Sequence, residues 1–183
     1  SKETKDFFDM MINEELMDLE NRSGKSGGGF CTSFPSLERP YIFANFNGTD
    51  HDVTVLTHEA GHAFQGFQSR KQPVNRYLWP TYEACEIHSM SMEFLTWDWM
   101  HLFFKEDTEK FLFKHLAGSL AFLPYGALVD HFQHWIYENP DATPKERKLQ
   151  WLELENIYQP GKNYGNLNFF KNGGFWQKQA HIY

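Results

Sequence analysis

A helix-periodic apolar segment at residues 53–67, VTVLTHEAGHAFQGF, places three titratable side chains where a buried helix face is expected. Buried polar groups cost free energy unless a partner satisfies them. His58 and His62 are four residues apart, so they lie on one helix face and can reach one zinc ion at about 2.0–2.1 Å. Glu59 lies about 100° around the helix from His58, where it can act on a metal-bound water without being a ligand. Gly61 keeps this surface small, and we expect another backbone segment to approach it closely.

A catalytic zinc ion needs a third protein ligand and one open position. We expect that ligand on a second helix, residues 81–105, which begins TYEACEIHSMSMEF. This segment holds four candidate ligands, which are Glu83, Glu86, His88 and Glu93. Its carboxylates share a stripe that apolar residues surround almost completely, which favours burial against a cation over a solvated acidic face.

The remaining pattern predicts a mainly helical chain with a small strand element near the N-terminus. We expect a strand at 41–46 and helices at 5–20, 52–69, 81–105, 108–138, from Pro144 to about 158, and from Phe175 onward. The string Gly24-Lys25-Ser26 does not predict a phosphate loop, because Leu19 stands where that motif requires glycine. No internal domain boundary is obvious.

Composition excludes some classes of partner. A formal net charge of −7 argues against a nucleic-acid binder, because neutralising phosphates needs a basic surface. Two cysteines and a polar, charged N-terminal segment without signal-peptide features favour a reduced, cytoplasmic setting. No run approaches the roughly 20 apolar residues of a membrane span, so we expect no membrane partner.

The motifs HEAGHAF and EIHSMSMEF resemble the thimet-oligopeptidase family of zinc metallopeptidases, specifically its oligoendopeptidase F branch. The likeness extends through GKSGGGFC, IFANFNGT, LPYGALVDHFQHWIYENP and GGFWQKQAHIY, and so covers nearly the whole chain. It implies a multi-helical zincin-type catalytic core with one zinc ion per chain. The glutamate of the family's Glu-x-x-Ser segment matches Glu86, with Ser89, and this selects Glu86 as the third ligand. We therefore expect residues 1–183 to be the catalytic-core fragment of a longer metallopeptidase, without its N-terminal helical portion and C-terminal end.

Spacing and the resemblance place further residues around the metal. By its spacing, Glu93 lies two turns beyond Glu86 on the same helix face, and Glu93 and Glu83 are candidates to accept the free ring N–H of a zinc-bound histidine. His181 matches a family histidine that helps to hold the substrate carbonyl, and would donate to the developing oxyanion. GKSGGGF and YIFANF resemble the part of the family's cleft where a short strand can pair with an extended peptide. Three other histidines are expected to pack or to support the ligands only: His88, which should point to another helix face, His131 and His134.

These assignments predict an endopeptidase that cleaves short, unstructured oligopeptides. Zinc on His58, His62 and Glu86 activates a water, and Glu59 takes its proton and delivers it to the leaving amine. One alternative is a truncated or inactive relative that binds zinc and peptide without turnover, although an intact Glu59 weakens it. Another is a carboxylate di-metal bundle, which needs two Glu-x-x-His elements; only Glu59-x-x-His62 is present.

Overall fold

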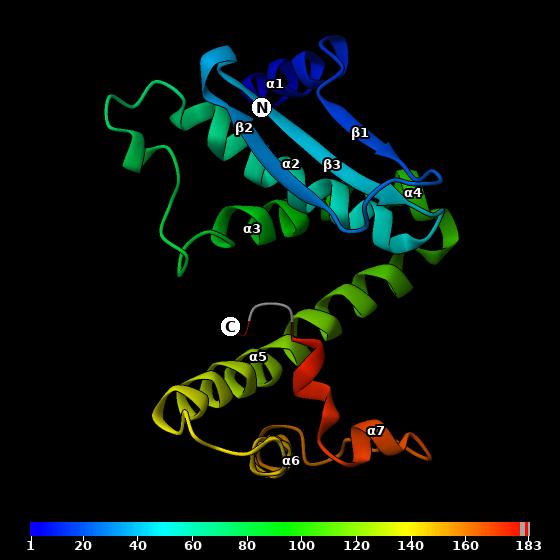
Figure 1. Cartoon of the computed structure of the whole chain (residues 1–183). Coiled ribbons are helices and arrows are strands. Elements are labelled where there is room, and N and C mark those ends of the chain that lie inside the picture. Colours follow the sequence, from blue (N-terminus) through cyan, green and yellow to red (C-terminus); the bar gives the residue numbers. More distant parts are fainter. Residues whose placement is uncertain (180–181, 183) are drawn as a thin grey trace. The chain divides into compact units, whose positions relative to one another are not determined.

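The computed structural model describes residues 1–179 and 182, and Figure 1 shows the course of the chain. The chain divides into two compact units, Ser1–Phe111 and Leu112–Tyr183. The division falls inside a continuous helix, α5 (Thr108–Glu138). A helix carries no Gly- or Pro-rich linker signal, which explains why the sequence indicated no boundary.

The first unit contains a three-stranded sheet of order β1-β3-β2 (Figure 1). The central strand β3 (Arg39–Phe46) contains the predicted strand at 41–46 and pairs with both neighbours. β1 (Met17–Glu20) runs parallel to it and β2 (Phe30–Phe34) antiparallel. Alternate β3 residues are buried, as expected for a strand with one face on a core. The sequence missed both β1 and β2.

The predicted helix at 5–20 is wrong in its second half. Helix α1 (Lys2–Asn13) ends just before Glu15, whose φ is +54°. This left-handed conformation cannot continue a helix. The chain then turns into β1, where the ladder with β3 satisfies the backbone groups. Apolar residues at positions 16, 17 and 19 therefore belong to a strand.

Helix α2 (Asp50–Ser69) covers the sheet and confirms the helix predicted at 52–69 (Figure 1). The fully buried core of this unit joins α1, β3 and α2 through Phe7, Met11, Ile42 and Ala63. Gly66 of α2 faces β2 so closely that an added Cβ would lie 3.0 Å from the Ser33 hydroxyl. This packing fixes α2, and with it the HEAGH segment, against the sheet.

The predicted helix at 81–105 is broken into short pieces. Residues 81–86 form turns held by i→i+3 bonds, from Ala84 N–H to Thr81 C=O and from Ile87 N–H to Ala84 C=O. Helix α3 (Ile87–Leu95) follows, then a 3₁₀ turn (Trp97–Trp99), α4 (His101–Phe104) and another 3₁₀ turn (Lys105–Asp107). Local bonding competes with the helix at its end, because the Thr96 hydroxyl donates to the carbonyls of Met92 and Glu93.

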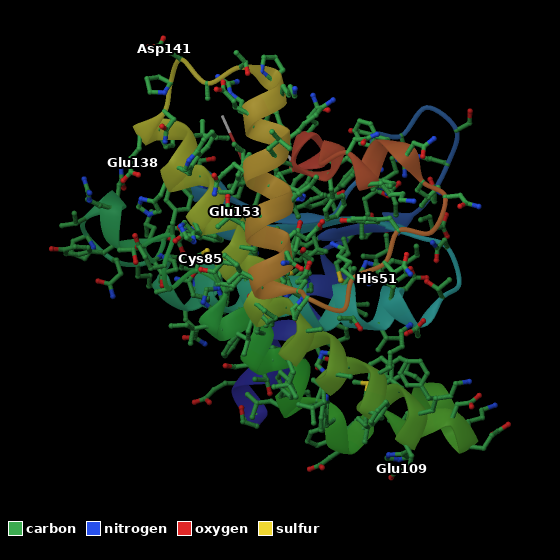
Figure 2. All side chains as sticks on the ribbon, turned by 90° about the horizontal axis from the view of Figure 1, so that it is seen from below. His51, Cys85, Glu109, Glu138, Asp141 and Glu153 are labelled. Atoms are coloured by element: carbon green, nitrogen blue, oxygen red, sulfur yellow. The ribbon has the colours of Figure 1, made fainter. Side chains whose placement is uncertain are left out.

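The second unit is helical. α5 and α6 (Pro144–Tyr158) confirm the predicted helices, and α6 begins with a capping box of Thr143 and Glu146. Their buried contact consists of Leu128, Phe132, Trp151 and Leu154. In Figure 2, Asp141 marks the turn between the two helices, and Glu153 marks α6. A short α7 (Asn168–Lys171) was not predicted, and the last predicted helix is a 3₁₀ turn, Gly174–Lys178.

Among the described residues, one helical stretch, His101–Glu138, is long and apolar enough to cross a membrane. That criterion uses length and composition only, and core helices of soluble proteins meet it as well. This stretch corrects the expectation that no segment approaches the length and apolar character of a membrane span. One such helix is weak evidence for a membrane-spanning segment. The absence of a membrane partner stays a prediction.

Candidate metal centre

The site lies where α2 crosses α3, and Gly61 makes the crossing possible. A Cβ added at Gly61 would lie 2.6 Å from the Ser89 Cα and 2.9 Å from the His88 carbonyl oxygen. Both atoms are backbone, so only glycine permits this approach. The close approach expected from the sequence is confirmed, and it places the first turn of α3 beside the histidines of α2.

Three ligand atoms converge at this crossing. Glu86 Oε2 lies 2.9 Å from His58 Nε2 and 3.2 Å from His62 Nε2, and the two nitrogens are 3.2 Å apart. Tetrahedral coordination with bonds of about 2.0–2.1 Å separates ligand atoms by about 3.3–3.4 Å. The triangle of candidate ligand atoms is slightly smaller than this ideal, and three such ligands would leave a fourth tetrahedral position for another ligand. His58, His62 and Glu86 form a group that could hold a metal ion.

The hydrogen bonding around His58 also favours a cation. Its Nδ1 lies 2.6 Å from Glu93 Oε1, so the ring proton belongs on that nitrogen. Nε2 then presents a lone pair towards Glu86 Oε2 and His62 Nε2. Lone pairs that face a carboxylate oxygen across about 3 Å repel it unless a proton or a metal ion lies between them.

The site's electrostatics follow from partial burial among carboxylates. Burial works to lower the pKa of His58, but the hydrogen bond that its ring donates to Glu93, together with the charges of Glu86 and Glu93, outweighs it and raises that pKa. The pKa of His62 is lowered, chiefly by burial. The pKa of Glu86 is also lowered: burial opposes this, but the Ser89 hydroxyl and the two imidazoles favour its charged form. An anionic Glu86 beside neutral His62 is the state that binds a metal ion.

Glu86 differs in one respect from the expectation. Its side chain is 51% exposed, where burial was expected. The reason is local: residues 81–86 are turns, and Glu86 is the N-cap of α3 instead of an interior helix position. Cys85, labelled in Figure 2, lies in the same turn segment. The Ser89 hydroxyl donates to Glu86 Oε2 at 2.7 Å and fixes the carboxylate at the mouth of the site.

The two predicted supporting carboxylates have different positions. Glu93 is buried and accepts the ring N–H of His58. Glu83 is exposed, and its carboxylate is bonded to Thr81 and to its own backbone. The prediction that Glu83 and Glu93 share one helix face required a regular helix from residue 81. Turns take the place of that helix over residues 81–86.

Glu59 lies beside the three convergent atoms and is not one of them. It is 8% exposed, and burial raises its pKa, to which the nearby charge of Glu86 adds. The backbone N–H of Cys31 on β2 donates to this carboxylate. Its Oε2 is buried without a hydrogen-bond partner among the residues that the structure describes. A carboxylate with raised basicity and one free oxygen is suited to accept a proton.

Two further residues contact His62: Trp79, which sequence reasoning missed, and His88, for which only a packing or supporting role was expected. Trp79 stacks on its ring at 5.8 Å, and His88 Nε2 lies 3.0 Å from its Nδ1. His88 was expected on another face, because a position two residues after Glu86 on a regular helix points away. Since Glu86 precedes the helix, that rule does not apply. The sequence itself carried no signal for Trp79.

The other predicted histidines lie elsewhere or are not described. His131 bonds the Tyr158 hydroxyl at 3.1 Å, and His134 lies 3.8 Å from Asp130, both in the second unit. His181, the predicted oxyanion donor, lies outside the described residues. Its role stays a prediction.

The strand beside the site is β2, which changes one expectation. YIFANF forms part of β3, which is paired on both sides and cannot add a peptide. β2 has a free edge within the described part of the chain, and it follows the glycines of GKSGGGF. Lys25 holds this preceding loop: its side chain is 2% exposed and donates to the carbonyls of Asp18, Glu20 and Ala44.

Comparisons with known proteins bear on the family and the fold of this chain. The sequence model of peptidase family M3 matches residues 3–182. A solved structure of PZ peptidase A with an inhibitor is 58% identical, with a TM-score of 0.95, over 100% of this chain and 32% of that one. A structure described as a candidate oligoendopeptidase F is 56% identical, with a TM-score of 0.95 and the same coverage.

A third structure, a candidate oligoendopeptidase F from Bacillus anthracis, is 52% identical, with a TM-score of 0.85. It matches 97% of this chain and 34% of its own. A search of curated proteins gave no match. The chain thus spans about a third of the length of the solved structures that it resembles.

Proposed function

Because this chain belongs to peptidase family M3, we propose that it carries the zinc centre of an endopeptidase that hydrolyses short, unstructured oligopeptides. One observation carries the proposal: His58 Nε2, His62 Nε2 and Glu86 Oε2 lie within 3.2 Å of one another. Beside them, Glu59 keeps one buried oxygen free. A hydrolytic zinc site needs this combination of three protein ligands, an open position and a general base.

The chain's own residues would hold the ion and supply the proton transfers. His58, His62 and Glu86 would be the ligands, and zinc, when bound, would supply Lewis-acid polarisation and a water of lowered pKa. Glu59 would take the proton of the attacking water on its free oxygen, and then deliver it to the leaving amine. The Cys31 backbone N–H, which favours the charged form of Glu59, would orient its carboxylate during both steps.

The free edge of β2 supports an extended peptide as the substrate. A peptide paired with this edge would be recognised through its backbone and would need no particular sequence. Because the β2 residue Cys31 touches Glu59, such a peptide would pass beside the general base. We restrict the proposed substrates to short oligopeptides because the chain resembles oligoendopeptidase F. We propose a cytoplasmic location because of the cysteine content.

The test compares three proteins on a short quenched fluorescent peptide, with and without a chelator. We expect Glu59→Gln to retain zinc while kcat falls by about 10²–10⁴, and the chelator to abolish turnover by the wild type. Glu153→Gln is the matched control, because Glu153 is an exposed residue of α6 (Figure 2). Turnover that survives the chelator, or a fully active Glu59→Gln, contradicts the mechanism.

The same measurement separates the alternative function. A chain that binds stoichiometric zinc and peptide, but shows no turnover above Glu59→Gln, is the inactive binding relative. The unpartnered oxygen of Glu59 favours an active enzyme over an inactive binding relative. Burying an oxygen without a hydrogen-bond partner costs about 1–3 kcal/mol, and a role in proton transfer accounts for this cost.

A further inference from the structure

The two candidate histidine ligands have different partners on their second ring nitrogens. His58 Nδ1 faces the carboxylate of Glu93 at 2.6 Å. His62 Nδ1 faces another imidazole, His88 Nε2, at 3.0 Å. The partner of a ligand histidine fixes its tautomer and ring orientation. We infer that His88 is a positioning residue that orients His62 for the metal, an inference that rests on the proposed function.

The protonation pattern follows from the ligand atoms. His62 turns Nε2 towards Glu86 and His58. A ligand nitrogen must be unprotonated, so neutral His62 carries its proton on Nδ1. That proton points at His88, which must accept it on an unprotonated Nε2 and carry its own proton on Nδ1. His88 thus selects the tautomer of His62 that leaves the metal-facing nitrogen free.

The surroundings of His62 leave its ring little freedom. The His88 ring meets it edge to face at 5.0 Å and 78°, while the Trp79 indole stacks on it at 5.8 Å and 26°. His62 is 8% exposed, so water does not readily replace the His88 bond. Stacking restricts the tilt of the His62 ring but does not distinguish its two tautomers. A hydrogen-bond acceptor that faces Nδ1 does, because it favours the tautomer with the proton on that nitrogen.

His88 and Glu93 give the two ligands unequal basicity. A carboxylate that accepts a ring N–H makes the opposite nitrogen a stronger donor to the metal, and a neutral imidazole does so less. His58 is therefore the more basic ligand and His62 the less basic one. Both partners are on α3, so one helix sets the orientation of both histidines of α2.

Two substitutions separate the hydrogen bond from the stacking. His88→Gln places an acceptor oxygen near the position of Nε2 and removes the ring. His88→Phe keeps the ring against Trp79 and His62 and removes the acceptor. His88 is only partly buried, so both variants should fold, and circular dichroism with urea unfolding checks this.

The readout is zinc affinity, measured on the intact chain by competition with a chromophoric chelator. We expect His88→Phe to weaken zinc binding about 10–100-fold, and His88→Gln to lose less than about tenfold. The cobalt-substituted His88→Phe protein should also show altered absorption bands, while His88→Gln resembles the wild type. The opposite ranking, or equal affinity in all three proteins, overturns the role of His88.

The outcome for the wild type distinguishes this inference from the proposed function. If the wild type binds no zinc, the proposed function fails, and the role of His88 fails with it. If the wild type binds zinc and His88→Phe binds it equally well, only the inference about His88 is refuted.

Discussion

Gly61→Ala tests the crossing of α2 and α3 on which the whole site depends. The added methyl carbon would lie 2.6 Å from the Ser89 Cα and 2.9 Å from the His88 carbonyl oxygen. Ordinary contact begins near 3.4 Å. Helix α3 must therefore retreat by about 0.8 Å, because close-packed backbone cannot absorb the methyl group locally.

The expected cost combines two opposing effects. Overpacking costs about 1–3 kcal/mol, and backbone contacts place this site at the upper end. Alanine in a helix recovers about 0.5–1 kcal/mol relative to glycine. The free energy of unfolding should therefore fall by about 2 kcal/mol, and the melting temperature by about 4–8 °C for a chain of this length.

Zinc affinity should fall as well. Metal sites tolerate displacements of about 0.2 Å, and a retreat of α3 moves Glu86 away from His58 and His62. We expect at least about a tenfold loss of affinity, comparable with the loss of a ligand's supporting partner. The assays are urea unfolding and chelator competition on the same preparation.

Gly118→Ala is the matched control for this substitution. Gly118 lies inside α5, and an added Cβ would have open space around it. That variant should be more stable than the wild type by about 0.5–1 kcal/mol. A Gly61→Ala protein as stable as the wild type would refute the close approach, and a destabilised one with unchanged zinc affinity would refute its link to Glu86.

Two further predictions concern the loop before β2. Lys25→Met removes the buried ammonium group that donates to the carbonyls of Glu20 and Ala44. We expect about 2–3 kcal/mol of destabilisation in urea unfolding, and a neutral effect would contradict this. Hydrogen bonds from Arg22 and Lys25 lower the pKa of Asp18 below its ordinary value. The ionised carboxylate therefore contributes to the free energy of unfolding above the unfolded-state pKa near 4, and this contribution is lost as the pH falls towards the folded-state pKa. The stability difference between wild type and Asp18→Asn should therefore shrink between pH 6 and pH 3, and a constant difference would count against this ion pair.

The parts of the site within one helix could be predicted from the sequence. His58 and His62 share a face because α2 is regular from residue 50 to 69, and helical spacing then determines their relation. Glu59 follows for the same reason. The mainly helical fold and the β3 strand also followed from periodicity. These inferences needed only local interactions.

Glu86 needed more than spacing. The turns at 81–86 are held by i→i+3 bonds that no apolar pattern indicates, so the predicted stripe grouped Glu83 with Glu86. Only the resemblance to a known family selected Glu86 by its Ser89 partner. β1 escaped prediction because its four residues pair with a strand far along the chain, Met17 with Ile42, and short strands depend on such non-local partners. β2 pairs with β3 across the short connection Pro35–Leu37 and Glu38, and its five residues were too few to show an alternating pattern by themselves.

One helix, α3, determines the geometry of the candidate metal site. α3 carries Glu86 at its N-cap, His88 beside His62, Ser89 at the contact with Gly61, and Glu93 beside His58. A displacement of α3 therefore changes a ligand and both imidazole orientations together. Substitutions at the crossing should consequently couple with His88→Phe in a double-mutant cycle, since additivity fails for residues that share partners. Strict additivity of their effects on zinc affinity would show that α3 does not act as one unit.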